Sequence, residues 1–161
     1  MKIKKVISTV FCIIMTVSCD RKIDLNLPSV FSDFMILQRE TEVTFWGKSS
    51  PNEKIEIKGT WGKYSSTKAD KSGNWELKLV TPSAGGPYEV VVNDSKNSIL
   101  YKDVLIGEVW LASGQSNMQW KLNQCKNCID NQDEEIENAN YNEIRFFNNP
   151  MDLSGTIINS Q

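Results

Sequence analysis

Short runs of alternating apolar and polar residues, separated by turn-forming residues, dominate the chain between positions 42 and 101. The alternation is clearest at Ile55 and Ile57, which stand between charged neighbours, and at Trp75, Leu77 and Leu79. A period of two places alternate side chains on one face of a β-strand, so each run is expected to bury one face. The pattern predicts six strands, at residues 42–46, 54–58, 61–68, 75–80, 88–93 and 98–101.

Turn-forming residues connect these runs and argue against helix. Residues 70–74 contain Gly73, which tolerates a positive φ, and Pro51 and the Gly-Gly-Pro of residues 85–87 interrupt any helical pattern. No helix is expected between residues 30 and 101. Burying one face of every strand favours an antiparallel β-sandwich, which we place at residues 27–102.

The pattern changes after Asp103. Residues 104–112 are almost continuously apolar, which predicts a strand covered on both faces, as in a parallel sheet. Residues 133–139 are expected to form a short helix with acidic residues near its start, and residues 144–147 a second strand. These elements predict the β-α-β start of an α/β domain at residues 103–161. Its apolar faces would be uncovered, so this part is expected to be a truncated domain that is not stable alone.

The first residues are typical of an export signal. Three lysines precede an apolar stretch, residues 6–17, that is too short to span a bilayer. We therefore predict a signal peptide at residues 1–18 and a polar tether at residues 19–26. Cys19 resembles the lipidated cysteine of bacterial lipoproteins, and the alternative is an ordinary signal peptide with an incidental cysteine. The expected location is the periplasm or, through a lipid anchor, the cell surface.

Charge and cysteine content exclude several functions. The formal net charge is -2, and loss of the signal lysines makes the chain more acidic, so nucleic acid is not an expected partner. Membrane contact is expected only through the possible lipid anchor. Cys125 and Cys128 have the spacing of a zinc half-site or a redox pair, but zinc needs four ligands and the chain has no histidine. A local disulfide is the simpler interpretation in an oxidising compartment, and no metal or cofactor is expected.

A serine follows the long apolar run, at Ser116 in the sequence Gly-Gln-Ser-Asn of residues 114–117. A strand that leads into a glycine-flanked serine is how hydrolases expose a nucleophile. Met118 stands where the Gly-x-Ser-x-Gly elbow has its second glycine, and without its flanks the tetrapeptide is more typical of a turn or helix cap. A serine also needs a neighbouring base, and this chain has no histidine to act as one.

Three stretches carry a family resemblance: LPSVFSDFMILQR at residues 27–39, AGGPY at residues 84–88, and DVLIGEVWLASGQSNM at residues 103–118. Together they resemble bacterial sialate O-acetylesterases, which are SGNH (GDSL-like) hydrolases. The resemblance extends over residues 27–149 and implies that Ser116 attacks an acetyl carbonyl, with its backbone N–H as one oxyanion donor. The family's catalytic histidine and aspartate, and the glycine and asparagine of its oxyanion hole, lie in later blocks that this sequence does not reach. Asp103 and Glu108 match no triad position.

The resemblance implies an exported carbohydrate O-acetylesterase that acts on O-acetylated sugars, with sialic acid as the implied substrate and acetylxylan as an alternative. The chain is expected to be a fragment without activity of its own. The competing hypothesis is a non-catalytic, glycan-binding surface lipoprotein in which Trp46, Trp61 or Trp75 stacks on sugar rings. Core packing is the commoner role of such residues, and it is favoured most for Trp75.

Overall fold

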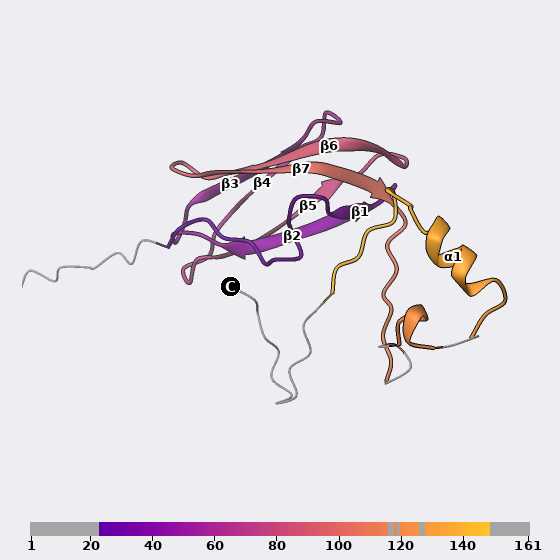
Figure 1. Ribbon diagram of the computed structural model, residues 1–161. Helices are drawn as coiled ribbons and strands as arrows, with labels where there is room; N and C mark the ends of the chain where they lie inside the picture. Colours follow the sequence, from indigo (N-terminus) through magenta and orange to yellow (C-terminus); the bar gives the residue numbers. More distant parts are fainter. Residues whose placement is uncertain (1–22, 116–117, 119, 126–127, 149–161) are drawn as a thin grey trace, which may run out of the picture.

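The computed structural model describes residues 23–115, 118, 120–125 and 128–148. Seven strands form most of the described structure (Figure 1). They are β1 (Ile36–Gln38), β2 (Glu42–Lys48), β3 (Lys54–Gly59), β4 (Tyr64–Lys68), β5 (Asn74–Val80), β6 (Gly85–Asn93) and β7 (Ser98–Gly107). One sheet has the order β1-β7-β6-β3-β4, and the other consists of β2 and β5. Only β1 and β7 pair in parallel, and the other described pairs are antiparallel.

The two sheets share one hydrophobic core. Phe45 of β2 and Leu79 of β5 belong to the same buried cluster as Ile57 of β3 and Val92 of β6. Strands β3 and β5 alternate strictly between exposed and buried residues, as their period of two predicts. Each fully buried side chain of this size contributes about 1.5–3 kcal/mol relative to an exposed one. The predicted mostly-β character and the predicted inward faces are therefore confirmed, and no described residue between 30 and 101 is helical.

Three details differ from the sequence-based expectation near the start of the fold. Strand β1 was not predicted, because three residues are too few to show a period. Leu25, inside the predicted tether, is buried in the core, and Asn26 forms an isolated bridge with Lys48. Strand β4 begins at Tyr64 instead of residue 61. The preceding residues make a turn, in which Gly62 has a φ of 86° and its N–H donates to the carbonyl of Gly59.

The prediction of one buried strand over residues 104–112 is wrong beyond Gly107. Residues 104–107 are the end of β7, where Val104 and Ile106 face the core between β1 and β6. Trp110 and Leu111 are 86% and 95% exposed, because no described residue packs over them. The continuous apolar run therefore consists of a strand end that packs in the core and an exposed segment that follows it.

The remaining elements are short. Helix α1 (Gln132–Asn138) confirms the helix predicted at residues 133–139, including the acidic residues of its first turn. No strand forms at residues 144–147, so the described residues do not contain the expected β-α-β unit. We call residues 25–107 the β region and residues 108–148 the extension. In Figure 1 the extension leaves the end of β7 and lies to one side of the strands. Among the described residues, no helix is long and apolar enough to cross a membrane.

Candidate functional site

The predicted nucleophile Ser116, its backbone N–H and the predicted lipid anchor Cys19 lie outside the described residues. Gln115, directly before the serine, and Met118, two positions after it, are described. The N–H of Met118 donates to the carbonyl of Gln115 at 2.9 Å. A Cβ at Gly114 would lie 2.6 Å from Cγ of Met118, so the exposed Met118 side chain would have to move to admit one.

The start of the extension is held by the end of β1. Glu108 follows β7 directly and accepts hydrogen bonds from Nε of Arg39 at 2.6 Å and from Nε2 of Gln38 at 3.0 Å. Gln38 also accepts a bond from the backbone N–H of Val109 at 2.9 Å. The hydrogen bond from Gln38, followed by that from Arg39, lowers the pKa of the Glu108 carboxyl, and the same contact raises the pKa of Arg39. Glu108 is therefore ionised and paired near neutral pH.

Arg145 holds the end of the extension. It contacts Asp103 within β7 and Phe34 just before β1. Its Nη2 lies 2.8 Å from Oδ1 of Asp103, and its Nη1 donates to the Asp103 carbonyl. The guanidinium also lies over the ring of Phe34, 5.7 Å from the centroid. Asp103 has a φ of 54° and Phe34 a φ of 65°, so the backbone is turned sharply at both contact points. Planar double hydrogen bonding and ring stacking are contacts that arginine makes and lysine does not.

These two clusters tie both ends of the serine-bearing segment to β1, β7 and their flanking turns. The first consists of Gln38, Arg39 and Glu108, and the second of Phe34, Asp103 and Arg145. The described residues between 109 and 144 therefore form a loop that leaves the β region and returns to it (Figure 1). This arrangement positions the segment without burying it.

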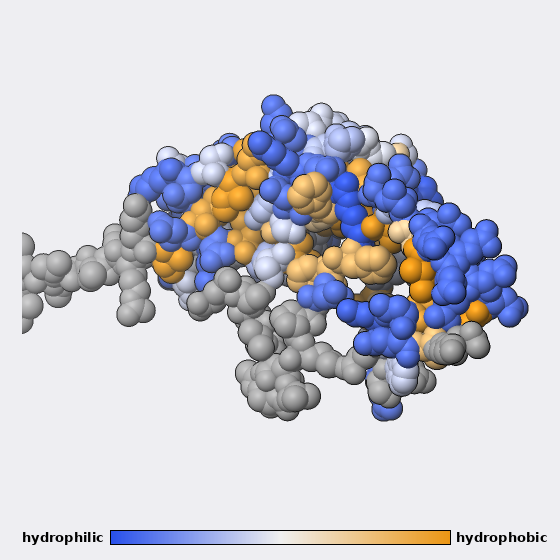
Figure 2. All heavy atoms as spheres, viewed as in Figure 1, coloured by the Kyte–Doolittle hydropathy of each residue, from blue (hydrophilic) through white to orange (hydrophobic). Residues whose placement is uncertain are grey.

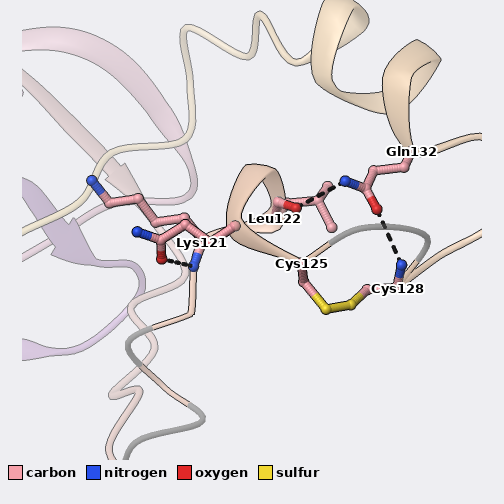
Figure 3. Close-up of a disulfide and its surroundings, with 6 residues drawn as sticks. Lys121, Leu122, Cys125, Cys128 and Gln132 are labelled. Atoms are coloured by element: carbon pink, nitrogen blue, oxygen red, sulfur yellow. Dashed lines mark hydrogen bonds between the residues drawn. A yellow bond between two sulfur atoms is a disulfide. The ribbon is translucent and has the colours of Figure 1, made fainter.

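The two cysteines form a local disulfide in the middle of this loop (Figure 3). Gln132, at the start of α1, donates through Nε2 to the carbonyl of Leu122 at 2.9 Å and accepts from the N–H of Cys128 at 3.1 Å. The Cys125–Cys128 bond confirms the interpretation as a disulfide and leaves neither sulfur as a free thiolate for zinc. In the described parts of the chain, no three or more histidine, cysteine, aspartate or glutamate side chains gather in a way that suits a metal ion.

The three tryptophans of the β region have different environments. Trp75 is core, as predicted. Trp61 is partly buried, packs edge-on against Tyr88 and donates from Nε1 to the carbonyl of Val80 at 2.9 Å. Trp46 remains 43% exposed on the outer face of β2. Of the candidate sugar platforms, Trp46 is thus the one with the largest free surface.

Sequence reasoning missed the residues of the two anchoring clusters. Asp103 and Glu108 match no triad position, and in the structure both pair with arginines instead. The sequence does contain a signal for the first cluster, because residues of opposite charge, Arg39 and Glu108, directly follow β1 and β7. Only the parallel register of Gln38 with Gly107 brings these charges together.

Known proteins resemble this chain in sequence and in structure. No protein-family model matches the chain. It is 32% identical over 154 residues to mouse sialate O-acetylesterase, covering 88% of this chain and 28% of that protein. The human sialate O-acetylesterase is 33% identical over 135 residues, covering 76% and 25%. A solved carbohydrate acetylesterase from Xanthomonas citri superposes with a TM-score of 0.60 and 41% identity, covering 64% of this chain and 24% of that one. The chain spans about a quarter of the length of these relatives.

Proposed function

The chain belongs to the sialate O-acetylesterase family, and on this basis we propose that the whole protein is a carbohydrate O-acetylesterase with Ser116 as its nucleophile. The substrate is an O-acetylated sugar, with sialic acid first and acetylated xylan second. The similarity over 154 residues is the single observation that carries this proposal. The hydrogen bond from the N–H of Met118 to the carbonyl of Gln115, one residue on each side of the Ser-Asn pair, supports it.

The chemistry is a double displacement. Oγ of Ser116 attacks the acetyl carbonyl as a base removes its proton, and the sugar oxygen leaves with a proton. Water then attacks the acetyl-serine, which releases acetate and restores the hydroxyl. The backbone N–H of Ser116 is one donor to the oxyanion that develops in both steps. The two anchoring clusters hold the ends of the loop that carries this residue.

We further propose the architecture in which this chemistry takes place. The β region is a β-sandwich, and the extension is the start of an SGNH domain whose further strands cover Trp110, Leu111 and Phe146. A signal peptide at residues 1–18 exports the protein, and lipidation at Cys19 anchors it to the membrane surface. Export suits the Cys125–Cys128 disulfide, because such bonds persist in oxidising compartments.

The 161 residues alone are expected to be inactive on acetyl esters. They contain no histidine, so Ser116 has no imidazole to take its proton. Loss of the base in a serine triad costs on the order of a millionfold in kcat in the subtilisin example. Acetate release from O-acetylated sialic acid and from acetylxylan should therefore equal that of the Ser116→Ala variant. Turnover that Ser116→Ala abolishes would show that another group acts as base.

The test of the enzyme assignment begins with the DNA beyond the codon for Gln161. An in-frame continuation that encodes Asp-x-x-His gives a protein whose acetate release can be measured on both substrates. In that protein, Ser116→Ala should lower kcat by about a millionfold, and its ratio of rates on the two substrates assigns the sugar. A continuation with no such segment, or full turnover by the alanine variant, would refute the assignment.

A further inference from the structure

We propose that the outer face of β2 and β5 is a binding groove for a neutral pyranose sugar, with Trp46 as the surface on which the ring stacks. The groove is open to solvent and has a volume of about 800 Å³, which is within the range of small-ligand sites. It lies between residues 26–28, the end of β2 and the start of β5, and no residue of the extension lines it. The proposal therefore goes beyond the esterase function and does not depend on Ser116.

The Trp46 ring is exposed and yet fixed in position. It makes an edge-to-face contact with the ring of Phe31, with centroids 4.8 Å apart and planes at 74°. Phe31 in turn stacks on Phe45, which is fully buried, at 4.8 Å and 19°. An aromatic surface that is already immobilised loses little side-chain entropy when a ligand binds. The exposed part of the indole thus offers a rigid apolar surface to the C–H face of a pyranose ring.

Hydrogen-bond donors and acceptors both lie beside the Trp46 ring. Trp46 pairs in register with Glu76, and Lys48 pairs with Asn74, so all four side chains share the outer face. Among the described residues, neither the Glu76 carboxylate nor the Lys48 ammonium has a hydrogen-bond or ion-pair partner. A carboxylate accepts from sugar hydroxyls and an ammonium donates to them. With Asp70, which also lines the groove, there are two carboxylates and one ammonium, and this acidic balance favours a neutral sugar over an acidic one.

Trp75 borders the groove from the core side. Residue 75 alternates with the outward residues 74 and 76, so its ring faces the core and is only 4% exposed. It therefore supports the groove from beneath and takes no part in the proposed hydrogen bonds to the sugar. Asp70 has a different role, because its carboxylate already accepts from the N–H groups of Ser72 and Asn74 within its own turn.

The test is a titration of the full 161-residue chain with xylohexaose as the neutral probe and 3′-sialyllactose as the acidic probe. Nitrogen-edited NMR spectra report each indole N–H separately, and Trp46→Phe assigns the signal of residue 46. Xylohexaose should shift the Trp46 signal in a saturable way, with weaker or no response to sialyllactose. No saturable shift at about 10 mM xylohexaose, or tighter binding of the acidic probe, would overturn the proposal.

Variants separate stacking from a general loss of structure. Trp46→Ala should weaken xylohexaose binding by about tenfold, and Trp46→Phe should retain part of it. Glu76→Gln keeps the shape of the side chain and should weaken binding severalfold through loss of the carboxylate. Tyr64→Ala is the matched control, since Tyr64 is an aromatic residue 81% exposed on β4 of the other sheet, and it should bind as the unchanged chain does. Equal binding by Trp46→Ala and Tyr64→Ala would contradict the proposal. Because no acetate is measured, failure here is distinguishable from failure of the esterase assignment.

Discussion

The β region and the extension are both rich in apolar residues, but only the β region buries them. Buried residues occur from Leu25 to Ile106, whereas no described residue from Glu108 to Asn148 is buried. Most of the exposed large apolar side chains are in the extension. In Figure 2 orange apolar surface lies beside the mainly hydrophilic surface over α1. An apolar side chain is stabilising only when a second surface covers it, and the pairing of two sheets provides that surface in the β region alone.

Different interactions therefore hold the two regions. The β region is held by a shared core, in which each buried side chain contributes about 1.5–3 kcal/mol. The extension is held at its ends by ion pairs, of which Arg39 with Glu108 is exposed on both sides. Exposed ion pairs contribute little and are screened by salt. Substitutions in the core should therefore cost far more stability than substitutions in the extension.

Removing a phenylalanine should cost much stability in the β region and almost none in the extension. Phe45→Ala should lower the free energy of unfolding by about 3–5 kcal/mol, because the fully buried ring leaves a cavity between the sheets. Phe146→Ala should change it by less than about 0.5 kcal/mol, because that ring is 86% exposed. Urea unfolding followed by far-UV circular dichroism measures both. A large loss of stability in Phe146→Ala would mean that the extension packs against the core.

Gly47 and Gly107 should differ in how well they tolerate a side chain. Gly47→Ala should destabilise the β region by about 1–3 kcal/mol, since its Cβ would lie 2.1 Å from the backbone oxygen of Asn26. At Gly107 the nearest atom would be Cγ2 of Ile36 at 4.0 Å, so Gly107→Ala should stay within about 0.5 kcal/mol of the unchanged chain. Urea midpoints determine both values. Similar midpoints for the two variants would show that Asn26 does not pack on β2 as described.

Asp94 should give the β region a dependence on pH. Burial raises its pKa, but hydrogen bonds from Lys96, Asn97 and Ser49 together lower it below the usual value. A lowered folded-state pKa stabilises the fold above the unfolded-state pKa of about 3.9, and this stabilisation disappears as the pH falls through the folded-state pKa.

Asp94→Asn should therefore be less stable than the unchanged chain by about 1 kcal/mol at pH 7, and the difference should shrink as the pH falls below about 4. Urea midpoints at a series of pH values from neutral to acidic provide the measurement. A difference that stays constant with pH would mean that the ionised carboxylate is not the stabilising species.

The anchor at the start of the extension should control access to residues 109–115. Glu108→Gln removes the charge that pairs with Arg39 and should speed chymotrypsin cleavage after Trp110 or Leu111 by about two- to fivefold. Glu40→Gln is the control, because Glu40 pairs with the same arginine through Nη1 at 2.9 Å but does not contact the extension. Mass spectrometry of early digests identifies the sites. Equal rates in the two variants would argue against anchoring by Glu108.

Reduction of the Cys125–Cys128 disulfide should have the smallest effect. The bond closes a short loop within the extension and joins no strand of the β region. The urea midpoint of the β region should be unchanged by a reductant, while cleavage near residues 120–130 becomes faster. A shifted midpoint would show that the two regions unfold as one unit.

Local pattern predicted most of the β region because burial there follows the period of the strand. Ile55, Ile57, Leu77 and Leu79 face inward as their alternation requires, and the turn with Gly73 lies where its sequence places it. The same reasoning failed at residues 104–112, since an unbroken apolar run contains no period from which to read a boundary. Local patterns could not predict the anchoring pairs either, because the paired residues are about 40 to 70 positions apart in the sequence.

Four properties could be inferred from the residues alone: the mostly-β character, the inward faces of β3 and β5, the local disulfide and the family relationship. Most of these are local, since period, turn chemistry and short spacing act over a few residues. Three others follow from the folded arrangement: the place where β7 ends, the contacts of Glu108 and Arg145 that tie the extension to the β region, and the exposure of Trp46 beside a buried Trp75. These outcomes depend on which distant residues meet, and strand pairing across the chain fixes that.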